Sequence, residues 1–415
     1  MTLFASTDAH WVGTRIGAAA LAAVTTSLFW VWMAVSVAEL VSVGLTAVAA
    51  RRHGEGQPEV AARTAGDALL LALALGVTIS IAGRAFLPQL FVATDVPDDV
   101  AALGRSYLGV YLAGMPLIFG YFAIDAAFRA AGDARTPFLL LASSVVVTLI
   151  IDPLLIVGAG PFPELGVAGA ALATVTTRGV VFIAGGILLW RRGMIVFGRP
   201  SRHVLGSIAR IGLPTAATGV AFSVIYVVVA RTISGFGTPA VAALGLGHRI
   251  ESWLYMVGVG FGAAAAALVG QNLGAGQFSR ARRAGWMTAG WASAAGVVIA
   301  LIQLVVAEPL AGLFTTDAAV VAESVRYLRT AALAQMFVCA EVVLEGAMGG
   351  AGYTLSPMLA STSITLLRIP LCIWAASTWG TIGVWWVLAL TAAGRGLAMI
   401  VLWHRGRWAG GALQP

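Results

Sequence analysis

The sequence contains no lysine and few charged residues of any kind. Asp, Glu, Lys and Arg together make up 10% of the 415 residues, whereas 59% are hydrophobic and the mean hydropathy is +0.91. Water-soluble domains carry about 25% charged residues, so this chain has too few to cover the surface of a soluble fold. The composition therefore excludes a soluble protein and predicts that a lipid bilayer is the solvent for most of the chain.

Cysteine is scarce as well. Cys339 and Cys372 both fall inside long apolar runs, and neither has a partner at disulfide or metal-ligand spacing. The sequence also lacks a cluster of metal ligands and a nucleophile beside a base, so we expect neither an enzyme nor a bound cofactor. The alternating polarity of ten-residue barrel strands is missing too, which leaves helices as the spanning elements.

Long apolar runs are what the sequence does have. Crossing a hydrocarbon core of about 30 Å takes roughly 20 residues of helix. Read end to end, the runs predict an all-α polytopic membrane protein with eleven full spans and one partial span at the start. The clearest runs cover 18–50, 68–82, 138–156, 167–190, 216–230, 286–307 and 356–379.

All 25 basic residues are arginine, and their placement indicates a membrane orientation rather than nucleic-acid binding. Arginines concentrate in alternate loops, and the loops between those hold mainly acids. By the positive-inside rule the arginine-rich loops are cytoplasmic. We therefore expect a multi-pass protein of the inner (cytoplasmic) membrane with both termini in the cytoplasm. The arginine-rich loops contain Arg51, Arg52, Arg63, Arg129, Arg135, Arg191, Arg192, Arg199, Arg202, Arg210, Arg280, Arg282, Arg283, Arg405 and Arg407.

The two halves of the chain match each other at a shift of 220 residues. One shift aligns several separate stretches, which indicates an internal duplication. Six spans per copy is an even number, so both copies keep one orientation. We expect two six-helix lobes across a central cavity: an N-terminal lobe over 1–192, a linker over 193–207 and a C-terminal lobe over 208–415. Matching landmarks are Gly17 and Gly237, Gly54 and Gly274, Gly132 and Gly352, and Pro137 and Pro357.

The first helix is predicted to be truncated. Its counterpart in the second copy runs from about Ile208 to Ala230, and the same shift would start the first helix about a dozen residues before Met1. We therefore expect the first helix to lack its cytoplasmic half.

Several motifs resemble one known family in their order and spacing. Asp8 is followed by the end of the first helix, FRAAGDARTP spans 128–137, Asp152 and Pro153 precede GVAGAALAT at 166–174, and VGQNLGAG spans 269–276. Together they resemble the multidrug and toxic compound extrusion (MATE) family over nearly the whole chain. The resemblance implies an antiporter that expels cationic or amphipathic small molecules in exchange for H⁺ or Na⁺.

The family's coupling carboxylates match Asp8 and Asp152. The duplication points to the same residues, because Asp8 falls on Val228 and Asp152 on Cys372, whereas a purely structural acid should persist in both copies. Ionisable groups inside hydrocarbon are costly and mark function or pairing. We predict that these two aspartates carry the cation-coupling site.

At one other position, both copies of the repeat carry an acid. Asp125 falls on Glu345, and as part of the shared architecture it is expected to pair with Arg129 or to cap the helix end.

Two threonines could complete the coupling site. The family often has asparagine one turn before the second aspartate, and here that residue is Thr148. A Na⁺ site would use Asp8, Asp152 and Thr174. The alternative is that the threonine hydroxyls bond their own helix backbone.

Two further residues are candidates for contact with substrate. Glu251 could form a second acidic site, or it could balance Arg249 or Arg395. Trp30 could stack on a flat cation, or it could be a packing or anchoring residue.

Other functions stay open. A flippase for lipids or lipid-linked oligosaccharides, from the same superfamily, would need several cationic residues facing a phosphate. A non-transporting membrane scaffold would need no uncompensated acids. We expect the partners to be a small-molecule substrate and the bilayer, with no nucleic acid, and the chain to be a monomer.

Overall fold

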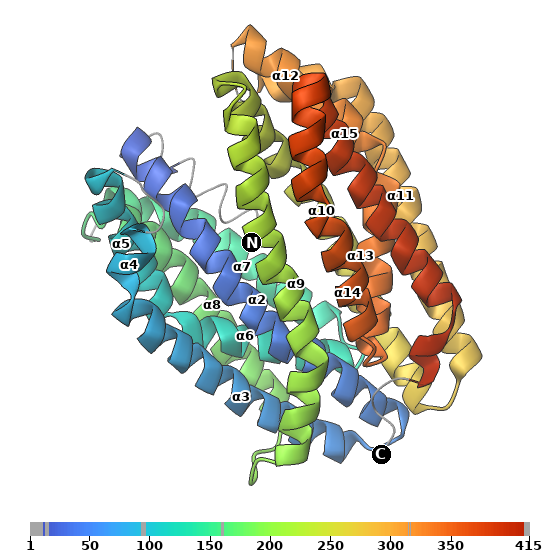
Figure 1. Cartoon of the computed structure of the whole chain (residues 1–415). Coiled ribbons are helices and arrows are strands. Elements are labelled where there is room, and N and C mark those ends of the chain that lie inside the picture. The colour runs from blue at the N-terminus through green and yellow to red at the C-terminus, as the bar shows by residue number, and fades with distance from the viewer. Residues whose placement is uncertain are drawn as a thin grey trace. The chain divides into compact units, whose positions relative to one another are not determined.

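The computed structural model describes residues 11–12, 16–92, 97–158, 162–313, 315 and 317–410. Within these residues the regular secondary structure is entirely helical (Figure 1). This confirms the all-α prediction. The partial first helix and Asp8 lie largely outside the described residues.

The helices are long and apolar enough to cross a membrane many times. Eight candidate spans occur in the described part of the chain, and ten if each of two bent helix pairs is one span. The last candidate, Leu355–His404, has 50 residues, and its backbone is non-helical at Gly380 (φ 67°). At about 1.5 Å per residue it is more than twice as long as the hydrocarbon core is thick. The break at Gly380 divides this helix into two segments that are each long enough to cross the membrane. The chain is therefore a multi-pass membrane protein.

The chain divides into two compact units, Met1–Ala216 and Ala217–Pro415. In the first unit α2 packs against α3, α5 and α6, and α8 packs against α5, α6 and α7. The helices of this unit are α2 (Ala18–Gly54), α3 (Pro58–Ala85), α4 (Leu87–Val92), α5 (Asp98–Ala113), α6 (Met115–Ala130), α7 (Arg135–Val157), α8 (Val167–Arg191) and the first part of α9 (Arg202–Ser234).

In the second unit α13 is the central helix, since it packs against α10, α11 and α15. The elements of this unit are the rest of α9, α10 (Thr238–Gly274), α11 (Phe278–Gly312), α12 (Ala318–Ala332), α13 (Gln335–Gly350), α14 (Leu355–Leu366), α15 (Arg368–His404) and a 3₁₀ turn at Arg407–Gly410.

The helix boundaries repeat along the chain. Helices begin at residues 18, 58, 98, 115 and 135 in the first unit and at 238, 278, 318, 335 and 355 in the second, so each start recurs 220 residues later. The α5–α6 pair is bent by 50° and the α12–α13 pair by 54°. Gly132 (φ 87°) and Gly352 (φ 77°) both adopt the left-handed conformation that favours glycine. This periodicity equals the shift of 220 residues found in the sequence.

The segment between α8 and α9 is held against α3. The backbone amide of Val196 donates to the carbonyl of Ala62 at 3.0 Å, and the amide of Ser201 donates to Asp67 Oδ2 at 3.1 Å. α9 begins at Arg202, six residues earlier than the predicted start at Ile208, because the Ser201 hydroxyl accepts a hydrogen bond from the Val204 amide at 3.4 Å. The last residues of the predicted linker are therefore helical.

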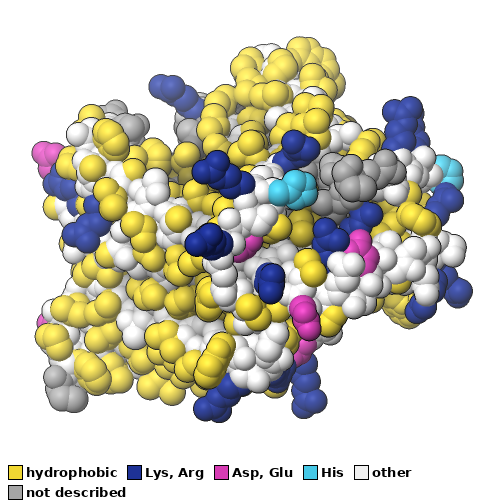
Figure 2. Space-filling model, turned by 90° about the horizontal axis from the view of Figure 1, so that it is seen from below, with side chains coloured by type: hydrophobic (Ala, Val, Ile, Leu, Met, Phe, Trp, Pro, Cys, Tyr) yellow, Lys and Arg dark blue, Asp and Glu magenta, His cyan; other side chains and the backbone are white. Residues whose placement is uncertain are grey.

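Arginines mark the ends of several helices. Basic residues occupy the last turns of α2, α3, α6 and α8. Figure 2 shows a face on which arginine side chains gather while acidic ones are few.

Candidate cation-coupling site

Asp152 lies in α7, and none of its surface is exposed. Pro153 follows it inside the same helix. Proline has no backbone N–H, so the carbonyl of Leu149, one turn earlier, loses its usual helical partner. The helix therefore combines a buried acid with a locally weakened backbone.

Thr148 and Thr177 connect α7 to α8. Their hydroxyl oxygens are 2.9 Å apart, and both side chains are buried. Each hydroxyl oxygen also lies 2.8 Å from a carbonyl of its own helix, that of Thr148 from Ser144 and that of Thr177 from Ala173, so the two hydroxyl hydrogens are shared among these three contacts. Thr148 therefore bonds its own helix backbone, as the alternative interpretation of the threonines stated.

The register of α7 and α8 places Thr174 beside Asp152. The helices run antiparallel, Thr148 contacts Thr177, and Gly169 abuts the backbone of Leu155 near the far end. Between these two contacts, Asp152 lies at the level of Thr174. Thr174 is 3% exposed, and its hydroxyl has no hydrogen-bond partner in the described part of the chain.

A buried carboxylate with a hydroxyl at its level can hold a proton or a hard cation. Oxygen ligands of this kind suit hard metal ions. The predicted third member, Asp8, lies outside the described residues. Among the residues that are described, no group of three His, Cys, Asp or Glu side chains could hold a metal ion.

Asp125, another acid of the first unit, is paired with Arg129, one of the two roles that the sequence suggested for it. Asp125 Oδ2 lies 2.6 Å from Arg129 Nη2, and that guanidinium also donates to the Ser42 hydroxyl at 3.3 Å. The prediction of an i,i+4 ion pair is confirmed.

Trp30 lies on α2, one turn after Ser27, whose hydroxyl approaches the carbonyl of Gly104 in α5 at 3.5 Å. Trp30 is half-buried, and its indole N–H has no hydrogen-bond partner among the described residues. An enclosed donor of this kind could meet a ligand, so its role as a substrate contact stays a prediction.

Glu251 takes part in a polar network in the second unit. The Tyr327 hydroxyl donates to Glu251 Oε2 at 2.6 Å, and the Tyr327 ring lies edge-on to Trp385 at 4.8 Å. In the described part of the chain no arginine nitrogen lies within 4.0 Å of the Glu251 carboxylate, and Arg395 lies 3.3 Å from Glu341. The charge balance of Glu251 with Arg249 or Arg395 is therefore not a direct ion pair.

Two arginines of α15 share one aromatic ring, which the sequence analysis missed. The guanidinium carbons of Arg368 and Arg395 lie 5.9 and 5.7 Å from the ring centre of Phe222. Arg368 is 7% exposed and donates to the Thr391 hydroxyl at 2.7 Å. Their intramembrane charge was visible in the sequence, but their meeting over one ring depends on the packing of α9 against α15.

The family model described as MatE matches residues 1–154 and 214–374, three quarters of the chain. The chain belongs to the MatE family of transporters. This confirms the resemblance seen in the sequence motifs.

Individual proteins are similar to this chain over most of their length. The probable multidrug resistance protein NorM of Thermotoga maritima is 27% identical over 92% of this chain and 83% of its own. A protein of Shewanella oneidensis named FAD transporter is 30% identical over 76% of this chain and 70% of its own. The structure of a MOP superfamily transporter from Pyrococcus furiosus superposes with a TM-score of 0.89 at 24% identity, covering 98% and 91% of the two chains. That likeness shows a shared fold.

Proposed function

We propose that this protein is a cation-coupled antiporter that exports cationic or amphipathic small molecules by alternating access. The observation that carries the proposal is the full burial of Asp152 at the level of Thr174. Family membership and the names of relatives such as NorM support export of multiple drugs.

Asp152 and Asp8 would act as the coupling acids. A charged carboxylate inside hydrocarbon costs several kcal/mol, about 2.5 or more, so binding H⁺ or Na⁺ stabilises the state in which the acid is enclosed. A ligand shifts a conformational equilibrium only by its differential affinity for the two states. Cation binding would therefore favour one direction of opening, and Pro153 supplies a point at which α7 can bend.

The role of Thr174 depends on which cation is coupled to transport. If Na⁺ is the ion, the Thr174 hydroxyl joins Asp8 and Asp152 as a ligand, whereas H⁺ needs only a carboxylate. Thr148 positions α7 through its bond to Thr177. We place the protein in the inner (cytoplasmic) membrane as a monomer with both termini in the cytoplasm, because of the arginine distribution.

The test is dye efflux from proteoliposomes with a proton gradient and a sodium gradient imposed separately. Efflux under at least one gradient is expected, and a non-transporting scaffold would give none under either. If Na⁺ is the driving ion, Thr174→Val should raise the Na⁺ concentration required while Thr174→Ser retains the normal value. Equal behaviour of both variants under a sodium gradient would remove Thr174 from the site.

A second candidate is export of an anionic, phosphate-bearing amphiphile. Arg368 favours it, because this guanidinium is buried, stacks on Phe222, and has no carboxylate oxygen within 4.0 Å in the described part of the chain. The name of the relative called FAD transporter supports export of such a substrate. Counterflow of a flavin nucleotide against a cationic dye separates the two candidates, and Arg368→Gln should impair only the flavin.

A further inference from the structure

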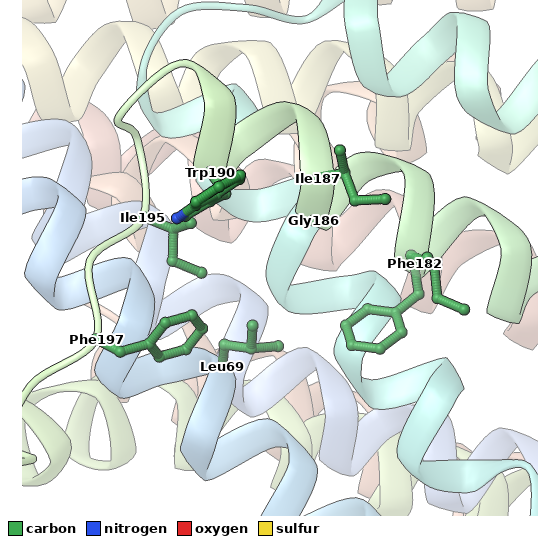
Figure 3. Close-up of a pocket in the computed structure, with 8 residues that line it drawn as sticks. Leu69, Phe182, Gly186, Ile187, Trp190, Ile195 and Phe197 are labelled. Carbon is green, nitrogen blue, oxygen red and sulfur yellow. The ribbon is translucent and has the colours of Figure 1, made fainter.

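An apolar groove of about 290 Å³ lies at the end of α8 (Figure 3). Trp190, Ile195 and Phe197 surround one end of it and Phe182 lies at the other, with Leu69 of α3 between them. We call this the α3–α8 groove. The segment that joins the two halves of the chain forms part of its wall, through Ile195 and Phe197, and every side chain in the wall is apolar.

The groove opens onto a continuous apolar surface of α8. Val180, Ile183, Ile187 and Trp190 are spaced three or four residues apart, so they lie on one face of the helix. Their exposed fractions are 60%, 56%, 47% and 68%. In a membrane protein such a face contacts lipid, and a tryptophan at the end of a spanning helix is typical of the interface with the headgroups.

Positive charge lies beside the groove where α8 ends. Arg191 and Arg199 are exposed, and within the described residues no carboxylate oxygen is within 4.0 Å of either guanidinium. The arginine between them in sequence differs, because Arg192 pairs with Asp133 at 2.7 Å. Two uncompensated arginines at the edge of a membrane attract anionic headgroups.

We propose that the α3–α8 groove binds one acyl chain of an anionic phospholipid, whose phosphate contacts Arg191 and Arg199. The groove volume of about 290 Å³ leaves room for a segment of one acyl chain. The bound lipid would pack on Ile195 and Phe197 and so stabilise the connecting segment against α3. This site is separate from Asp152 and independent of the proposed transport activity.

Native mass spectrometry of the full chain, purified in detergent and titrated with phosphatidylglycerol or phosphatidylcholine, tests the proposal. The wild type should retain one phosphatidylglycerol in preference to phosphatidylcholine. Arg191→Gln should lower phosphatidylglycerol retention about fivefold, and the Arg191→Gln/Arg199→Gln double variant roughly 25-fold. Trp190→Ala should lower it as well, because the groove loses one wall.

Matched controls come from the second unit. Trp291 is 69% exposed, close to the 68% of Trp190, and Arg280 and Arg283 are exposed in the first two turns of α11. Trp291→Ala and Arg280→Gln/Arg283→Gln should leave retention unchanged. Thermal melting of every variant verifies folding.

Three outcomes would overturn the proposal. Equal retention of both lipids by the wild type, or equal loss in the Trp190 and Trp291 variants, would mean ordinary annular lipid. A dimer peak in the same spectra that Trp190→Ala abolishes would identify a second copy of this chain as the occupant.

Discussion

The hydroxyl oxygens of Thr148 and Thr177 lie 2.9 Å apart, and this contact between α7 and α8 sets Asp152 at the level of Thr174. The two threonines are 29 residues apart in sequence, so only the packing of the helices brings them together. The proposed coupling site therefore depends on a helix register that a neutral hydroxyl pair maintains.

Removing this hydroxyl pair should destabilise the protein. Thr148→Val and Thr177→Val should each cost about 1 kcal/mol, the usual net value of one hydrogen bond. Because the two side chains contact each other, the double variant should cost less than the sum of the single ones. Melting temperatures of the four proteins in detergent give the comparison. Strictly additive shifts would show that the pair is not energetically coupled.

The close approach of α9 to α2 should make Gly212 intolerant of alanine. A Cβ at Gly212 would collide with the carbonyl oxygen of Leu40, a backbone atom that cannot move alone. Overpacking costs about 1 to 3 kcal/mol, which exceeds the gain of up to about 1 kcal/mol that alanine brings to a helix. Gly212→Ala should therefore lower the melting temperature.

Gly206, in the same helix, is the control for that change. No heavy atom lies within 4 Å of a Cβ added there, so the melting temperature of Gly206→Ala should equal or exceed that of the wild type. Equal destabilisation by both changes would contradict the predicted helix contact.

The buried indole of Trp385 should require Glu323 as its acceptor. Trp385 Nε1 donates to Glu323 Oε1 at 2.7 Å, and Trp385 is 1% exposed. Glu323→Ala leaves the N–H without a partner, which costs about 1 to 3 kcal/mol. Glu323→Gln keeps an oxygen acceptor and loses only the contact with the exposed Arg326, worth little. The melting temperature of Glu323→Gln should be well above that of Glu323→Ala. The reverse order would show that Trp385 does not depend on a hydrogen bond to residue 323.

Asp133, in the turn between α6 and α7, should give a pH-dependent contribution to stability. Partial burial raises its pKa, but hydrogen bonds from Thr136 and the contact with Arg192 at 2.7 Å outweigh burial and hold the pKa below its usual value. A lowered pKa in the folded state adds stability above the unfolded value of about 3.9. That stability is lost as the pH falls through the folded pKa.

The measurement compares wild type with Asp133→Asn from pH 7 to pH 3. The wild type should melt higher at pH 7, by an amount worth less than about 1 kcal/mol because the pair is partly exposed. The gap should close below about pH 4. A gap that widened toward low pH would show that Asp133 is not stabilised as an anion.

Local relations of the site could be predicted from the sequence, and distant ones could not. Asp125 and Arg129 are one turn apart, so their pairing follows from helix geometry alone. The back-bond of Thr148 to Ser144 follows in the same way. Tyr327 lies 76 residues from Glu251, and neither position alone marks the other as a partner.

The contacts of the segment between α8 and α9 could not be predicted from the sequence either. A linker was expected over 193–207, and the structure has no helix over 193–201. That Val196 would bond Ala62, and that Ile195 and Phe197 would complete an apolar groove, depends on where α3 lies.

In the proposed mechanism, cation binding at Asp152 is linked to movement of substrate. The most direct measurement is substrate-driven cation flux in proteoliposomes, with a pH-sensitive dye for H⁺ and a sodium indicator for Na⁺, for wild type, Asp152→Asn and the exposed-acid control Glu59→Gln. We predict that Asp152→Asn abolishes the flux while Glu59→Gln retains it. Unimpaired coupled transport by Asp152→Asn would show that Asp152 does not bind the coupling cation.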